Sequence, residues 1–201
     1  MKSILLDLPM PIMTPRLLIR PSRVGDGTVV NAAILESFAT LHQFMDWAKE
    51  KPTLEDSEEQ VRIAAANWIL KKNEEPWLQL FIFDRHSEQF IGATGFHSID
   101  WEVPRVETGY WIRTSCQGQG YMTEAINAIT QYAFKQLAVK RMAITCDSKN
   151  VRSKKIPERL GYHLEATLKA HRIAINGKLS DTLVYACYDI KNLPSLSVAW
   201  D

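Results

Sequence analysis

The chain has 201 residues, of which 46% are hydrophobic and 23% are charged, close to the averages of soluble globular proteins. A chain of this length forms a domain of ordinary size whose core needs no disulfides. Lys and Arg number 24 against 23 Asp and Glu, a formal net charge of +1. This balance excludes the strongly basic surface of a dedicated nucleic-acid-binding protein, so we expect no nucleic-acid partner.

The cysteines and the first residues of the chain bear on its compartment. Cys116, Cys146 and Cys187 are far apart and form no CxxC motif, which is typical of a reducing compartment and of neither a disulfide framework nor a zinc site. The histidines show no HxH or HExxH spacing, so we expect no metal. Asp7 and Pro9 interrupt the apolar start, and no long apolar run follows. We therefore expect a cytoplasmic protein with no signal peptide and no membrane span.

The first part of the chain predicts one strand and two helices. Residues 16–21 are apolar at their centre and are followed by Gly25-Asp26-Gly27, which favours a strand that ends in a turn. From residue 28 to about residue 49, apolar residues recur at the spacing of an amphipathic helix. After Pro52, the run Ser57-Glu58-Glu59 is typical of the first turn of a second helix.

The middle of the chain changes to a strand pattern. Residues 77–83, 90–99 and 106–112 are rich in aromatic and β-branched residues and are joined by turn residues, so we expect three antiparallel strands. A helix with an apolar stripe is expected over residues 121–137. The remaining predicted elements are a strand at 141–146, a helix from Asn150 to the residue before Gly161, and strands at 162–168 and 183–190.

Pro157 falls inside the predicted helix that begins at Asn150. A proline there removes a hydrogen-bond donor and costs about 3 kcal/mol or kinks the helix. A helix that starts nearer Ser153 would relieve the conflict. The order of all these elements predicts a mixed α/β domain with a central antiparallel block, because regular βαβ alternation is missing.

The segment SCQGQGYMTEA, residues 115–125, lies between a predicted strand and a predicted helix. Two glycines permit positive φ and close approach of the backbone to a ligand, and the backbone N–H groups at a helix N-terminus favour a phosphate. Thr123 stands where a dinucleotide-binding fingerprint needs its third glycine, and no lysine completes a P-loop. The loop therefore predicts an anion site that is neither a dinucleotide-binding fingerprint nor a P-loop. The alternative is a plain strand-to-helix turn that binds nothing.

The segment ETGYWIRTSCQGQGYMTEA, the later pair Asn150-x-x-Ser153 and the sequence ERLGY at residues 158–162 together resemble the GNAT N-acetyltransferase family. Within that family the chain resembles the RimJ/RimL-type branch, which acetylates the N-termini of ribosomal proteins. The opening TPRLLIRP, from Thr14, is similar to the first strand of the same branch. The resemblance covers residues 14–190, which implies that residues 1–201 form a single acetyltransferase domain with its core at 14–190.

The resemblance implies an α+β fold, with a mixed, mostly antiparallel, twisted sheet of six to seven strands flanked by helices. The strands at 106–112 and 141–146 would splay apart, and acetyl-CoA, as co-substrate, would lie in the gap. The pantetheine arm would pair with the backbone of Trp111, Ile112 and Arg113. The pyrophosphate would be held by backbone N–H groups of Gln117, Gly118, Gln119, Gly120, Tyr121 and Met122. Ser115 stands where the family has Gln or Arg. This departure affects side-chain contacts to the cofactor more than its binding by backbone N–H groups.

The reaction implied by the resemblance is direct attack of an amine on the thioester, which needs an acid for the departing thiolate and a group that deprotonates the amine. Ser153 matches the family's serine and is the expected acid. Asn150 would orient the cofactor arm, or it is a helix N-cap, and both interpretations stay open. No covalent intermediate is needed, so Cys116 and Cys146 are interpreted as packed residues.

The general base is harder to assign from the sequence. Glu107 shares a strand face with Gly109 and Trp111, so it is one candidate; alternatively it is a solvated carboxylate or a partner of Arg105. The branch places a Glu past the sixth strand, but the corresponding residues 169–172 contain none. His171 is the substitute there because histidine is a common general base near neutral pH, unless it is an ordinary surface histidine.

Two kinds of acceptor, and one interpretation without catalysis, stay open. The main expectation is the α-amine of a protein such as a ribosomal protein. A small amine, such as a polyamine, an amino sugar or an aminoglycoside, is the alternative, and a non-catalytic CoA-binding regulatory module is the third interpretation. A polyamine site needs converging carboxylates, and the candidates are Asp46, Glu50, Glu55, Asp56, Glu58 and Glu59. A monomer and a homodimer are both compatible with these residues.

Overall fold

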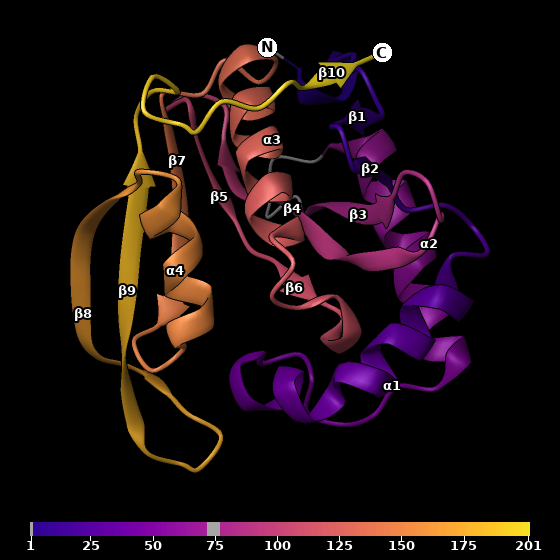
Figure 1. The fold of residues 1–201 in the computed structure, drawn as a ribbon, viewed down its shortest axis with the longest axis vertical. Coiled ribbons are helices and arrows are strands. Elements are labelled where there is room, and N and C mark those ends of the chain that lie inside the picture. Colours follow the sequence, from indigo (N-terminus) through magenta and orange to yellow (C-terminus); the bar gives the residue numbers. More distant parts are fainter. Residues whose placement is uncertain (1, 72–76) are drawn as a thin grey trace.

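The protein folds as one mixed sheet flanked by helices (Figure 1), in a computed structural model that describes residues 2–71 and 77–201. The strands follow one another in the order β10-β1-β2-β3-β4-β5-β7-β9-β8, and β6 pairs with β4 beside this path. Every pair is antiparallel except β5 with β7, which is parallel. The mixed, mostly antiparallel sheet and the flanking helices confirm the expected fold class.

The strands are β1 (Ile12–Met13), β2 (Leu17–Pro21), β3 (Leu78–Asp84), β4 (Phe90–Asp100), β5 (Arg105–Thr108), β6 (Trp111–Ile112), β7 (Arg141–Asp147), β8 (His163–Ile173), β9 (Leu179–Cys187) and β10 (Ala199–Trp200). The helices are α1 (Gly27–Phe44), α2 (Leu54–Leu70), α3 (Tyr121–Lys135) and α4 (Val151–Arg159). Short 3-10 helices cover Ser3–Leu5 and Thr114–Cys116. In the described chain seven strands are longer than two residues, in line with the expected number of six to seven.

Several predicted boundaries differ from the observed ones. Helix α1 ends at Phe44 rather than near residue 49. Helix α2 begins at Leu54 because the Thr53 side chain accepts the N–H of Asp56 while the Asp56 carboxylate accepts that of Thr53, a capping box that stabilises an earlier start. The last two strands are longer and form a hairpin, β8 with β9, around a turn that contains Asn176-Gly177.

The predicted strand 106–112 is interrupted at Gly109 and Tyr110. Strand β5 pairs with β7 up to the Thr108–Ile144 pair, whereas β6 pairs with β4 alone. Beyond this point the two sides of the sheet separate, and β6 runs away from β7 (Figure 1). The splay implied by the family resemblance is therefore present.

The two faces of β3 show how the core is divided. Leu78, Leu80 and Ile82 pack with the buried stripe of α3, whereas Phe81 and Phe83 pack with α1 and α2. This alternation is what a strand buried on both faces requires, since successive side chains point to opposite faces. The helices α1 and α2 therefore cover the face of the sheet that is opposite to α3.

The turn between β3 and β4 is organised by Asp84. Its carboxylate accepts the backbone N–H groups of His86 and Ser87, at 3.0 and 2.9 Å, and the Tyr121 hydroxyl at 3.2 Å. The hydrogen bond from the Ser87 N–H is the largest of the influences that lower the pKa of Asp84 to about 2. The same residue thus links the hairpin to the first residue of α3.

This carboxylate predicts a pH dependence of stability. Because folding lowers the pKa of Asp84 from 3.8 to about 2, its contribution is fully present above pH 3.8 and is lost as the pH falls through about 2. An Asp84→Asn variant should show a smaller drop in thermal unfolding temperature between pH 4.5 and pH 2 than the unmodified protein. Equal drops in the two proteins would contradict this role.

Candidate active site

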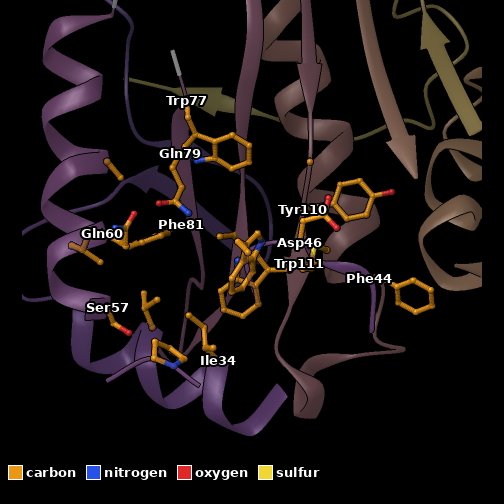
Figure 2. Close-up of a pocket in the computed structure, with 18 of the residues that line it drawn as sticks. Ile34, Phe44, Asp46, Ser57, Gln60, Trp77, Gln79, Phe81, Tyr110 and Trp111 are labelled. Atoms are coloured by element: carbon orange, nitrogen blue, oxygen red, sulfur yellow. The ribbon is translucent and has the colours of Figure 1, made fainter. Parts of the chain in front are cut away.

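A cavity of about 800 Å³ opens where the sheet splays (Figure 2). One side is formed by the end of α1, the segment after it, and α2. The other side is formed by the end of β7 and the start of α4, and the floor by β3, β4 and the Gly109–Trp111 segment. Cys146, Asp147, Asn150, Ser153 and Tyr110 therefore face the same space as the two N-terminal helices.

The loop before α3 presents backbone donors without partners. Gly118 has φ of 76° and Gly120 has φ of 81°, a region in which only glycine avoids strain. In residues 2–71 and 77–201 no acceptor is found for the backbone N–H groups from Gly118 to Thr123. The N–H of Gln117, by contrast, already donates to the Thr114 carbonyl at 3.2 Å. The free donors, at the positive end of α3, form a cradle suited to a phosphate.

Side chains fix this loop, which the sequence interpretation did not anticipate. Glu124 accepts from the Arg16 guanidinium at 2.6 Å and from the Thr14 hydroxyl at 2.6 Å. Arg16 also donates to the carbonyl of Gln119 at 3.0 Å and lies 4.5 Å from the ring centroid of Tyr121. The loop is therefore tied to the β1–β2 region of the sheet. The TPR sequence at residue 14 was the signal that could have suggested this.

The segment expected to meet the pantetheine arm is only partly free. The N–H of Arg113 already donates to the carbonyl of Ile91 at 2.8 Å, and Trp111 is opposite Ala93. Backbone groups of successive strand residues point to opposite edges, so Ile112 turns its N–H and C=O towards the open side of β6. The Trp111 side chain is buried and lines the cavity.

Tyr110, Ser153 and Pro157 form a connected group. The Tyr110 hydroxyl donates to the Ser153 carbonyl at 3.0 Å, and the Ser153 hydroxyl donates to the Tyr110 oxygen at 3.2 Å. In an uninterrupted helix that carbonyl would accept the N–H of residue 157, but Pro157 has none. The proline therefore leaves the carbonyl free for Tyr110, and α4 nevertheless begins at Val151 rather than near Ser153.

The ionisation of this group follows from its burial. Burial raises the pKa of Tyr110 well above its usual value, so its hydroxyl stays protonated near neutral pH. Burial also raises the pKa of Cys146 to about 11, so this residue remains a thiol rather than a nucleophilic thiolate. Asn150 caps α4, because its side-chain oxygen accepts the N–H of Ser153 at 3.0 Å. The N-cap interpretation of Asn150 is therefore confirmed.

Neither base candidate lines the cavity. Glu107 lies opposite His97 on β4, and burial lowers the pKa of His97 although Glu107 opposes the shift. Arg105 pairs with Asp100 at 3.5 Å rather than with Glu107. His171 is exposed, and its ring nitrogen bonds the Thr182 hydroxyl at 3.1 Å.

Arg172, the residue after His171, reaches the cavity instead. It donates to Asp46 at 3.0 Å, and its Nε lies 3.7 Å from an Asp147 oxygen. Asp147 is the buried carboxylate of the cavity wall, with 4% exposure. The sequence interpretation missed both residues, since their pairing joins β7, β8 and the segment after α1.

Metal clusters and membrane-spanning helices are both absent from the described residues. Within 2–71 and 77–201 no cluster of three or more His, Cys, Asp or Glu side chains is arranged to hold a metal ion. In the same segments no helix is long and apolar enough to cross a membrane.

Comparisons with known proteins agree with this geometry. The family described as "Acetyltransferase (GNAT) domain" matches residues 16–163. The ribosomal-protein-serine acetyltransferase of Escherichia coli (strain K12) is 27% identical over 146 residues, 73% of this chain and 78% of that relative. YdaF of Bacillus subtilis (strain 168) is 33% identical over 95 residues, 47% of this chain and 51% of YdaF, so the match spans about half of that relative.

A solved structure extends the comparison to the fold. The ribosomal L7/L12 alpha-N-protein acetyltransferase RimL, in complex with coenzyme A, superposes with a TM-score of 0.78 at 23% identity. The superposition covers 88% of this chain and 96% of that chain. The fold is therefore shared over nearly the whole chain.

The role of Pro157 can be tested by a double-mutant cycle on stability. Tyr110→Phe leaves the Ser153 carbonyl without its partner and should cost about 1–2 kcal/mol. In a Pro157→Ala background the new N–H of residue 157 bonds this carbonyl, so the same Tyr110→Phe change should cost less than about 0.5 kcal/mol. Urea unfolding of the four proteins measures the coupling between the two substitutions. Equal costs of Tyr110→Phe in the two backgrounds would contradict the role of Pro157.

Proposed function

The chain belongs to the GNAT acetyltransferase family, and on that premise we propose that it transfers an acetyl group from acetyl-CoA to the α-amine of a protein N-terminus, such as that of a ribosomal protein. The proposal rests on one observation, that a set of unpaired backbone N–H groups and a cavity with a proton donor occur in the same fold. The cradle of unpaired N–H groups before α3 suits the pyrophosphate of CoA, and the cavity at the splay contains the Tyr110–Ser153 pair. We take residues 1–201 as one domain, with its core at 14–190.

The cofactor-binding assignments follow the polarity of the backbone. Residues 118–122 offer N–H groups to the phosphates, and Ile112 offers a strand edge to the amides of the pantetheine arm, with Trp111 and Arg113 on either side of it. Arg152, whose guanidinium donates to the Gln117 side chain at 2.6 Å, adds positive charge beside the loop. Binding through backbone donors explains how a chain with net charge +1 accommodates a strongly anionic co-substrate.

The acyl group of acetyl-CoA supplies the electrophile, and the protein positions an amine and a proton donor around it. Ser153 and Tyr110 share hydrogen bonds at the mouth of the splay, so Ser153 is the proposed acid for the leaving sulfur, with Tyr110 and Asn150 holding it in place. Glu107 and His171 do not line the cavity. Each could act as the base only if its side chain moved towards the cavity or if a chain of waters carried the proton to it.

Neither candidate for the general base lines the cavity, and this favours an α-amine over other acceptors. An α-amino group has a pKa of about 7.7–8.0, whereas a lysine amine has a pKa of about 10.4. A useful fraction of α-amines is therefore neutral at physiological pH, and a site without a dedicated base can still acetylate them. Lysine and polyamine nitrogens would depend much more on a base.

Three of the six acidic residues that suggested a polyamine line the cavity, namely Asp46, Glu50 and Asp56, but two of these three are already engaged within the chain. Glu58 accepts the N–H groups of Gly25 and Gly27, Asp56 is part of the α2 capping box, and Asp46 pairs with Arg172. Glu55 and Glu59 do not line the cavity. Of the six, Glu50 lines it with no partner in the described chain. This arrangement supports a peptide acceptor over a polyamine, and the Tyr110–Ser153 pair supports catalysis over a purely regulatory module.

The test is acetyl transfer to a panel of peptides, polyamines and amino sugars, followed by release of free CoA thiol. Peptides with free N-termini should be the best acceptors.

Ser153→Ala should lower kcat by about 100-fold, the range of general acid catalysis, and change the Kd of CoA less than about twofold. Ser195→Ala, at an exposed serine outside the cavity, is the matched control. CoA binding without turnover on any acceptor would support the regulatory alternative, and an unchanged kcat in Ser153→Ala would remove its role.

The loop anchor gives an independent prediction on CoA affinity. Glu124→Gln breaks the ion pair to Arg16, which should weaken CoA binding by about fivefold, equivalent to about 1 kcal/mol. Glu165→Gln breaks the Arg141–Glu165 pair at the far edge of the sheet and should leave the Kd unchanged. Isothermal titration with CoA measures both, and equal losses in the two variants would contradict a specific role of Glu124.

A further inference from the structure

The wall of the cavity formed by α2 and β3 carries three side-chain amides. Gln60 and Asn67 come from α2, and Gln79 comes from β3. Figure 2 shows Gln60 and Gln79 entering the same space from the two sides. The two elements are linked by the Trp68 indole N–H, which donates to the Gln79 carbonyl at 2.6 Å, so the backbone of β3 is held beside α2.

None of these amides has a hydrogen-bond partner in the part of the chain that the structure describes. Asn67 and Gln79 are nevertheless half-buried. A side-chain amide offers two donors and an acceptor oxygen, and an amide that is withdrawn from water with no partner is costly. Asn67 and Gln79 are two such groups, and with the exposed Gln60 on the same wall they favour a ligand that both donates and accepts hydrogen bonds.

The spacing of the amides sets the length of this ligand. Gln60 and Asn67 are seven residues apart on one face of α2, which is about 10.5 Å along a helix axis. An extended peptide advances about 3.3 Å per residue, so the row matches about three residues of peptide backbone. A single sugar ring or a simple amine would reach only part of it.

The charges around the amides favour a cationic or neutral ligand over an anionic one. The carboxylates that line the cavity are Asp46, Glu50, Asp56 and Asp147, whereas Arg172 supplies the positive charge of the described wall and is already paired with Asp46. This field attracts the positive end of a peptide and repels acidic side chains. Buried apolar residues such as Phe81 and Val61 also line the cavity, and they suit uncharged side chains of a bound peptide.

We propose that Gln60, Asn67 and Gln79 form a subsite that binds the backbone amides of the first three residues of an acceptor peptide. This inference rests on the proposed function, because it specifies the acceptor of that reaction. The subsite makes peptide length a determinant of specificity. A single-residue acceptor such as serinamide presents the same nucleophile but only the first of the amides that the row would bind.

The experiment compares two acceptors that differ only in length, serinamide and Ser-Ala-Ala-Ala amide, with saturating acetyl-CoA. The unmodified protein should show at least about a tenfold higher kcat/KM for the tetrapeptide, since each net hydrogen bond contributes about 1 kcal/mol. Gln79→Leu and Gln60→Leu should each reduce this preference, the ratio of the two kcat/KM values, by about fivefold. Gln43→Leu, at an exposed glutamine of α1 outside the cavity, is the matched control.

The failures of the two proposals are distinguishable. Equal kcat/KM for the two acceptors, or equal losses on both in the variants, overturns the subsite while acetyl transfer to peptides stands. If no acceptor releases CoA thiol, the proposed function fails, and tetrapeptide binding in the presence of CoA, followed by tryptophan fluorescence, still tests the subsite. Equal peptide affinity of the unmodified protein and Gln79→Leu then overturns it. A glutamine-dependent preference for amino sugars over the tetrapeptide also overturns it.

Discussion

The end of the parallel pairing between β5 and β7 is the constraint on which the site depends. After the Thr108–Ile144 pair the two strands separate, so backbone groups of β6 and the last residues of β7 face a gap instead of each other. An unpaired strand edge leaves backbone groups free to bind a partner, and a side-chain contact within the chain also crosses this gap. Tyr110 spans to α4 and bonds both groups of Ser153, which is made possible by the missing N–H of Pro157.

The site is consequently built from backbone geometry more than from charge. Two glycines in the left-handed region turn the loop before α3 so that its N–H groups point outwards, and Arg16 and Glu124 hold that loop against β2. The helices α1 and α2 then close the cavity from the opposite face, where their apolar stripes pack on Phe81 and Trp111. The same packing places the row of amides on α2 opposite β3. One architecture thus joins the loop of unpaired N–H groups, the Tyr110–Ser153 pair and the wall of amides.

The sequence predicted the elements whose signals are local. Hydrophobic periodicity located α3 and the strands β3, β4 and β7 within a few residues, and the two glycines of the QGQGY loop indicated an anion site. The boundaries of α2 and of the β8–β9 hairpin were wrong although local signals existed, namely Thr53-x-x-Asp56 for the capping box and Asn176-Gly177 for the turn. Glu107 was placed near the cleft by strand alternation, which fails where a strand is interrupted, as here at Gly109.

The sequence by itself thus determined the fold class, the family resemblance and the position of the glycine loop before α3, because each depends on neighbours along the chain. Only the tertiary structure decided which side chains meet across the cavity. The Asp147–Arg172–Asp46 chain and the Tyr110–Ser153 pair join segments separated by 25 to 126 residues, and no local pattern encodes such contacts. The same holds for Asp46, whose side chain pairs with Arg172 of β8, and for Glu58, which accepts the N–H groups of Gly25 and Gly27.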